Sequence, residues 1–246
     1  MDQVIGRFPF TVEPFSEDFA GRLSWFYLGN HLLRCASLHA GSHGFGYQDV
    51  MKNHHAWVLS RLVVELDEMP RSGQHYTVET WVSKIYRQFT DRLFSIVDDN
   101  GKAYGHAFSI WALIDVNSRE PFDFASLDNE AFEKAVSARE IPIKGPGRVR
   151  VKSKDAVRTV KAYYSDLDIN GHVNSIRYIQ MILDLFSDEI YVQHKAVKRV
   201  EMSYCTESYC GETLYFFRED GEQGRSAVEV RKENGEVVVK AAVELV

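Results

Sequence analysis

The chain has 246 residues, of which 45% are hydrophobic and 26% are charged, a composition typical of a soluble globular protein with a full core. Its net charge of −6 argues against general nucleic-acid binding, which needs a basic surface. The first residues do not resemble a signal peptide, and no apolar run approaches the roughly 20 residues that span a bilayer. We therefore expect a cytoplasmic protein without a membrane span.

The first half predicts one helix followed by several strands. The predicted elements are, in chain order, a short strand, a polar turn, a helix and three β-rich stretches, at residues 10–12, 16–17, 23–38, 61–66, 76–81 and 93–97. The last stretch runs into Asn100-Gly101. Asn-Gly between alternating apolar runs is the strongest short-range hairpin signal, so we expect antiparallel pairing there.

Residues 141–147 contain two prolines and two glycines, a composition that interrupts regular structure. The second half then repeats the order of the first, at residues 157–163, 165–166, 175–186, 199–204, 214–217 and 227–230, and its hairpin signal is Asn234-Gly235. Arg61 and Arg199 are 138 positions apart, and so are Gly73 and Gly211. This shared spacing favours a duplication, with a helix wrapped in a curved antiparallel sheet used twice.

Residues 166–174 read D-L-D-I-N-G-H-V-N. If this segment is extended, its polar residues share one side, namely Asp166, Asp168, Asn170, His172 and Asn174. The simpler interpretation is an amphipathic edge strand or loop with a solvated face. However, Asn is disfavoured in strands, and five hydrogen-bonding side chains just before a helix favour a functional site. Asn174 also fits the N-cap of that helix, which we take as its main role.

The pattern Asp168-x-Asn170-x-His172-x-Asn174 before a helix resembles the C-terminal domain of the acyl-[acyl-carrier-protein] thioesterases of plants and bacteria. The residues around Trp57, Trp81 and Trp111 are similar to landmarks of that family's first domain, and the resemblance covers most of the chain. It implies an α+β fold of two tandem hotdog domains, which we place at residues 1–138 and 157–246 with a basic linker at 139–156. It also implies a hydrolase that releases free fatty acid from acyl-acyl-carrier-protein and so ends elongation.

The family also places a functional carboxylate on the strand after the helix, and this sequence has Glu207 at that point, 35 residues beyond His172. Plant members commonly carry a Cys next to this Glu that was once assigned as a nucleophile. Here the next residue is Ser208, which counts against a Cys nucleophile. Glu201 and Glu212 are rival carboxylates.

The resemblance thus implies catalytic roles for Asp168, Asn170, His172 and Glu207. Glu207, with Asp168 assisting or orienting, would activate a water as general base. His172 and Asn170, with the N–H groups at the helix start, would position the water or polarise the thioester carbonyl, whose oxygen becomes an oxyanion on attack. The sequence leaves open which group takes the proton.

The first half carries neither the histidine nor the acid. Its counterpart of the polar segment, residues 16–23, contains no His and no amide, and the position 138 before Glu207 is Met69. We therefore expect the first domain to be catalytically silent and to supply an acyl tunnel lined by apolar and aromatic residues.

Charge is unevenly distributed, since eight basic residues stand against two acids between Arg139 and Lys161. Such a segment can attract an acidic partner, so Arg148, Arg150 and Lys152 could dock the acyl carrier protein or hold its phosphopantetheine phosphate. A solvated linker that lies across an acidic first domain is the equal alternative.

The chain contains no phosphate-binding glycine loop and no metal-ligand spacing, and Cys35, Cys205 and Cys210 are odd in number. We therefore expect no cofactor, no metal and reduced thiols. Two other functions are weighed, because the same fold hosts acyl-CoA thioesterases and a non-catalytic acyl-binding module would also fit. The oligomeric state is left open between a monomer and a homodimer.

Overall fold

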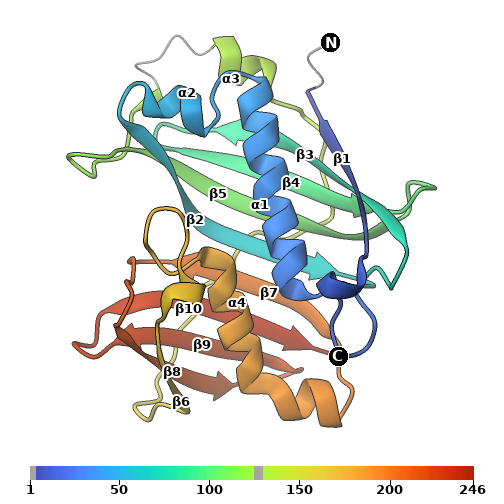
Figure 1. The fold of residues 1–246 in the computed structure, drawn as a ribbon, viewed down its shortest axis with the longest axis vertical. Helices are drawn as coiled ribbons and strands as arrows, with labels where there is room; N and C mark the ends of the chain where they lie inside the picture. Colours follow the sequence, from blue (N-terminus) through green and yellow to red (C-terminus); the bar gives the residue numbers. More distant parts are fainter. Residues whose placement is uncertain (1–3, 125–129) are drawn as a thin grey trace. The chain divides into compact units, whose positions relative to one another are not determined.

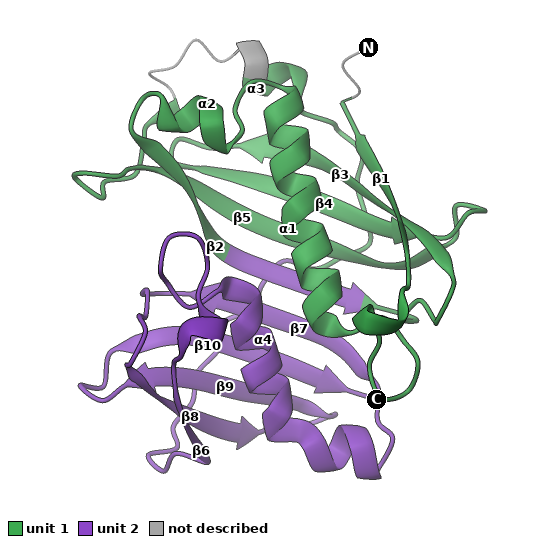
Figure 2. Ribbon diagram, in the orientation of Figure 1, with its two compact units in different colours: residues 1–60, 66–144 green, residues 61–65, 145–246 purple. Residues whose placement is uncertain are grey.

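The computed structural model describes residues 4–124 and 130–246. The chain divides into two compact units (Figure 2). The first unit comprises Met1–Ser60 and Leu66–Lys144, and the second comprises Arg61–Glu65 and Gly145–Val246. Each unit combines a helix with an antiparallel sheet, which confirms the α+β class.

In the first unit, the long helix α1 (Trp25–Ser42) lies across one face of a sheet (Figure 1). The strand order is β1-β3-β4-β5-β2, with antiparallel pairing from β1 through β5. The strands are β1 (Gly6–Thr11), β2 (His55–Leu66), β3 (His75–Ile85), β4 (Phe89–Val97) and β5 (Ala103–Asp115). Among the described residues, the unit also has the short helices η1 (Pro14–Ser16), α2 (Tyr47–Met51) and α3 (Glu130–Lys134).

In the second unit, α4 (Ser175–Leu183) continues into η4 (Asp184–Phe186) and η5 (Asp188–Val192). The strand order is β7-β10-β9-β8-β6, with antiparallel pairing throughout. The elements not yet given are β6 (Arg158–Lys161), η3 (Tyr164–Asp166), β7 (Val197–Tyr204), β8 (Thr213–Asp220), β9 (Arg225–Lys232) and β10 (Val237–Leu245). Residues 61–65 of β2 pair with β7 and belong to this unit.

The helix predicted over 23–38 is displaced toward the C-terminus, because Leu23 is held in a bridge with Glu17 and Ser24 caps the helix. The Ser24 hydroxyl accepts the N–H of Tyr27 at 3.4 Å. The second helix begins at Ser175, as predicted, and its α-helical part ends three residues before the predicted end at Phe186. Helix periodicity therefore located both helices, while their ends depended on local hydrogen bonds.

Both Asn-Gly hairpins are confirmed, since Asn100-Gly101 links β4 to β5 and Asn234-Gly235 links β9 to β10. Gly101 and Gly235 have φ values of +83° and +84°, a conformation that glycine adopts with little steric cost.

The packing of α4 fixes the position of the segment before it. Ile176, Ile179 and Ile182 recur at helical spacing and are buried, and burying each aliphatic side chain contributes about 1.5–3 kcal/mol. The start of α4 is therefore held firmly against the core of the second unit.

Candidate active site

The polar segment before α4 forms a tight turn, so the condition of an extended chain at residues 166–174 is not met. Leu167 pairs with Val173 in an isolated bridge, and the Asp168 N–H donates to the His172 carbonyl at 2.8 Å. The alternation does not place the polar residues on one face. Asp166 is buried, and Ile169, expected on the apolar side, is 90% exposed at the tip.

The Asp168 side chain accounts for this turn. Its Oδ1 accepts the backbone N–H of Asn170 at 2.8 Å and of His172 at 3.2 Å. Local bonds of this kind from Asp compete with regular strand structure. Gly171 supplies the positive φ, +78°, that the turn needs. Asp168 therefore orients His172, while Asn170 lies exposed beside the tip.

Asp166 and Asn174 build the start of the helix. The Asn174 Oδ1 accepts the N–H of Ile176 at 2.8 Å, which confirms its N-cap role. The buried Asp166 carboxylate accepts the Tyr163 N–H at 2.8 Å and pairs with Arg177 Nε at 2.7 Å. These contacts fix the approach of the chain to α4.

Glu207 lies in the connection between β7 and β8, which corrects the prediction that it lies on the strand. The pairing of β7 with β10 ends at Tyr204, after which the chain turns to meet the Asp168 turn. There the Val173 N–H donates to the Ser208 carbonyl at 2.8 Å, and His172 pairs with Tyr209 in a backbone bridge. This pairing brings the two segments of the predicted site together.

The predicted residues His172 and Glu207 face each other across this bridge. His172 Nε2 lies 3.5 Å from Glu207 Oε2, and both side chains are partly exposed, at 23% and 29%. The distance is longer than a good hydrogen bond and within the range of an ion pair. An imidazole beside a carboxylate at this exposure can move a proton to or from a small reactant.

The sequence pointed to Ser208 but gave no sign that Tyr209 belongs to this site. The Tyr209 hydroxyl donates to Glu207 Oε2 at 3.1 Å, and the Tyr209 ring stands edge-on to His172 with centroids 5.1 Å apart. Ser208 is buried and bonded to the Tyr178 hydroxyl, and burial raises the pKa of Tyr178. An aromatic residue two positions after Glu207 was visible in the sequence, but its partner His172 is distant along the chain.

The rival carboxylates, Glu201 and Glu212, are bonded to other partners. Glu201 is buried, pairs with Arg199 and Arg225 at 3.0 Å each, and accepts the Gly147 N–H. Glu212 accepts the Tyr209 N–H at 2.8 Å and pairs with Lys232 at 3.3 Å. Of these three glutamates, Glu207 is the one that lies beside the His172 ring.

The first unit repeats the frame of this site. The Asp18 Oδ1 accepts the N–H groups of Ala20 and Arg22, and the Leu23 N–H donates to the Pro70 carbonyl. Arg22 forms an isolated bridge with Arg71, as His172 does with Tyr209. The chemical groups differ: His172, Glu207 and Tyr209 correspond to Arg22, Met69 and Arg71.

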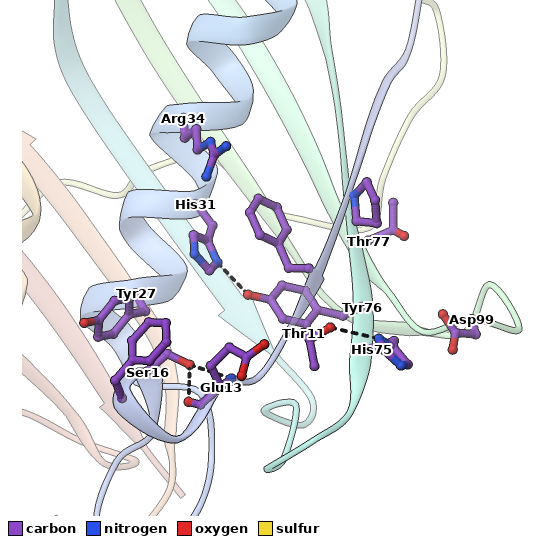
Figure 3. A pocket seen from close by; sticks show the side chains of 13 residues that line it. Thr11, Glu13, Ser16, Tyr27, His31, Arg34, His75, Tyr76, Thr77 and Asp99 are labelled. Atoms are coloured by element: carbon purple, nitrogen blue, oxygen red, sulfur yellow. Dashed lines mark hydrogen bonds between the residues drawn. The ribbon is translucent and has the colours of Figure 1, made fainter.

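A pocket of about 620 Å³ in the first unit lies beside α1, β1 and β3. Figure 3 shows His31 reaching the Tyr76 hydroxyl, at 2.5 Å. Burial, with the charge of Arg34, lowers the pKa of His31 to about 4. Glu13, Arg34 and Asp99 also line the pocket, so it is a poor match for the apolar acyl tunnel expected in this half.

The basic segment lies on the second unit. Arg148, Arg150 and Lys152 line a pocket of about 400 Å³ together with Arg225 and Glu219. The Lys152 N–H donates to Glu219 at 2.6 Å. Residues 147–152 thus contact Glu201 and Glu219 of the second unit, whereas Arg139 pairs with Glu79 within the first unit.

The residues that the structure describes contain no group of three or more His, Cys, Asp or Glu placed to hold a metal ion. The three cysteines carry free thiols. Within residues 4–124 and 130–246, no helix is long and apolar enough to cross a membrane.

Two units that each combine a helix with an antiparallel sheet define the α+β class, and comparison with known proteins specifies the family. The model of the acyl-ACP thioesterase N-terminal domain matches residues 7–126, and that of the C-terminal domain matches residues 150–245. A solved acyl-ACP thioesterase from Bacteroides thetaiotaomicron is 46% identical, with a TM-score of 0.92 over 99% of this chain and 98% of that one. The chain belongs to the acyl-ACP thioesterase family.

More distant relatives are plant enzymes. A chloroplastic acyl-[acyl-carrier-protein] hydrolase of Cuphea viscosissima is 27% identical over 197 residues, which cover 76% of this chain and 44% of the relative. The chain thus spans about half the length of the curated relatives it matches. The 12:0-ACP thioesterase of Umbellularia californica shares the fold, with a TM-score of 0.85 at 20% identity over 99% of this chain and 98% of that one.

Proposed function

We propose that this protein hydrolyses the thioester of a fatty acyl group on acyl carrier protein, releasing free fatty acid and so ending its elongation. The observation that carries the proposal is the contact between His172 and Glu207, 3.5 Å apart. The first unit keeps the same backbone frame with Arg22 and Met69 in their places. The backbone turn and bridge form in the first unit without a histidine and a glutamate. The fold therefore does not require His172 and Glu207, and a chemical role accounts for them.

In the proposed reaction, Glu207 takes a proton from water as general base. The hydroxide that results attacks the thioester carbonyl carbon, and the proton passes to the departing sulfur as the carbon–sulfur bond breaks. His172 and Asn170, with the N–H groups at the start of α4, stabilise the oxyanion. Asp168 holds His172 in place through the turn.

In this proposal the chain consists of two tandem hotdog domains, at residues 1–138 and 157–246, joined by a linker at 139–156. The matches to the N-terminal and C-terminal family models, at residues 7–126 and 150–245, support this arrangement. The first domain is catalytically silent in this proposal, and its lack of an equivalent of the His–Glu pair supports that role. The free thiols support a cytoplasmic location.

The carrier protein docks, in this proposal, on the basic pocket of Arg148, Arg150 and Lys152. The pocket includes Ala227, whose neighbours Val228 and Val230 are fully buried. Because side chains alternate along a strand, the pocket opens on the sheet face turned away from the core, whereas α4 packs on the core face. This position favours docking of the acidic surface of the carrier protein. It disfavours binding of the phosphate of the phosphopantetheine arm, because that arm also carries the acyl group to the proposed active site.

The test is thiol release from acyl-carrier-protein and acyl-CoA substrates of several chain lengths. We expect release from both, with the higher kcat/KM for the carrier protein. A higher kcat/KM for acyl-CoA would transfer the assignment to an acyl-CoA thioesterase. Tight acyl binding without release from either carrier would show a non-catalytic binding module and overturn the proposal.

A further inference from the structure

Tyr209 makes two contacts with the proposed catalytic pair. Its hydroxyl donates to the Oε2 atom of Glu207, at 3.1 Å, and this is the same oxygen that lies 3.5 Å from His172 Nε2. Its ring stands edge-on to the imidazole, at an interplanar angle of 88°. One side chain therefore touches both members of the pair and meets the carboxylate at the oxygen that faces the histidine.

Tyr209 also contacts residues outside the proposed catalytic pair. Its backbone N–H donates to Glu212 Oε2 at 2.8 Å. The Lys232 ammonium lies 5.8 Å from the centre of the ring and also pairs with Glu212 at 3.3 Å. The residue before it, Ser208, is buried and bonded to Tyr178. These contacts favour one position of the Tyr209 side chain, which is 46% exposed, and in that position its hydroxyl reaches Glu207.

Comparison of the two units shows which residues the backbone turn and its bridge require and which side chains differ. The aspartate of the turn and the positive-φ glycine are present in both units, as Asp18 and Gly21 and as Asp168 and Gly171. The residue that bridges to the turn is present in both but differs in type, Arg71 in one and Tyr209 in the other. Since arginine satisfies the same backbone bridge, the fold does not require tyrosine there.

We propose that Tyr209 is a positioning residue of the thioesterase reaction, holding the Glu207 carboxylate against His172 and favouring its ionised form. This inference rests on the proposed function. A hydrogen bond donated to a carboxylate stabilises the charged form relative to the protonated one. A general base must be ionised to accept a proton from water, so the tyrosine extends activity toward lower pH.

Tyr209→Phe removes only the hydroxyl and keeps the ring, which packs edge-on against His172 and faces the Lys232 ammonium. We expect kcat to fall about tenfold with KM changed less than about twofold, since one charged hydrogen bond is lost. The acid limb of the pH profile of kcat should move to higher pH by about one unit. Tyr164→Phe is the matched control, because Tyr164 is an 89% exposed tyrosine of the same unit, and it should behave as wild type.

Two further arms separate positioning from loss of structure. In a Glu207→Gln background, Tyr209→Phe should change kcat less than about twofold, because the coupling requires the carboxylate. In protein labelled with ¹³C at glutamate carboxyls, the Glu207 resonance should titrate at higher pH in Tyr209→Phe than in wild type. This titration needs no substrate, so it tests the inference even if wild type releases no thiol, a result that would contradict the proposed function.

A folded Tyr209→Phe variant with the wild-type pH profile and Glu207 titration would overturn the inference. An equal loss of kcat from Tyr209→Phe with and without Glu207 would also overturn it, since the tyrosine would then not act through this carboxylate.

Discussion

Asp168 and Asp18 build the same turn in the two units. Each Oδ1 accepts the N–H groups two and four residues further along, at 2.8 and 3.2 Å for Asp168 and at 2.8 and 3.1 Å for Asp18. The turn is thus part of the frame, and in the second unit it holds His172. Asp18 has a structural role only, whereas Asp168 also supports a proposed active site. The two roles can therefore be compared within one chain.

This pair gives the first prediction. Asp18→Ala and Asp168→Ala should each lower the free energy of unfolding, by about 1–2 kcal/mol, because each removes hydrogen bonds to a charged group. Only Asp168→Ala should lower kcat/KM, by about a hundredfold, since His172 loses its orientation. Urea unfolding and thiol release measure the two effects. A similar loss of activity in Asp18→Ala would contradict the assignment of chemistry to the second unit.

The second prediction concerns the cap of α4. Asn174→Ala should cost about 1 kcal/mol of unfolding free energy, while Asn174→Ser, which retains a capping oxygen, should cost little. Both folded variants should keep kcat within about threefold of wild type, because the Asn174 amide bonds to the helix N–H and not to the reactants. Ser24→Ala is the control in α1. A stable Asn174→Ser protein with severely reduced kcat would place the amide in the reaction.

The sequence predicted those parts of the fold that depend on neighbours along the chain. Helical spacing located α1 and α4, and Asn-Gly located two hairpins, because glycine at positive φ decides those turns. The repeated spacing of 138 residues correctly matched Met69 to Glu207, as the bridges of Arg71 and Tyr209 demonstrate.

The sequence failed where one pattern fits two structures. Alternation at residues 166–174 suits a strand, but the bonds from Asp168 and the positive φ of Gly171 make a turn instead. The position of Glu207 after β7, and the contact of Tyr209 with His172, follow from pairing between distant segments. Periodicity carries no information on such pairing.

The third prediction tests the docking surface. Glu substitutions at Arg148, Arg150 and Lys152 together should raise KM for acyl-carrier-protein about tenfold, since they repel an acidic partner. KM for a small acyl thioester should stay within about twofold, because the pocket is on the sheet face turned away from the core. Lys154→Glu is the matched control, as an exposed lysine of the same segment that does not line the pocket. An equal rise of KM for both substrates would rule out specific docking.

The fourth prediction concerns acid stability of the first unit. Buried His39 accepts from Arg92 through Nδ1 at 3.0 Å and donates through Nε2 to the Val4 carbonyl at 3.1 Å, so it is neutral. Burial, followed by the charge of Arg92, lowers the pKa of His39 from 6.5 to about 3. Between these values the unfolded chain binds the proton and the folded chain does not, so the free energy of unfolding should fall as pH is lowered.

Urea unfolding between pH 7 and pH 4 checks this prediction in wild type and His39→Gln. The variant should be less stable at pH 7 and should lose less stability over that range, because the residual loss then comes from other groups such as His31. An identical pH dependence in both proteins would show that His39 does not set the acid response.

The central claim is that the second unit hydrolyses acyl-carrier-protein thioesters through Glu207 beside His172. The most direct test is the rate of thiol release from saturating acyl-carrier-protein by wild type, Glu207→Gln and the matched first-unit variant Met69→Leu. We predict release by wild type and Met69→Leu at similar rates, and a loss of about a hundredfold or more in Glu207→Gln. A wild-type rate in a correctly folded Glu207→Gln protein would contradict the account.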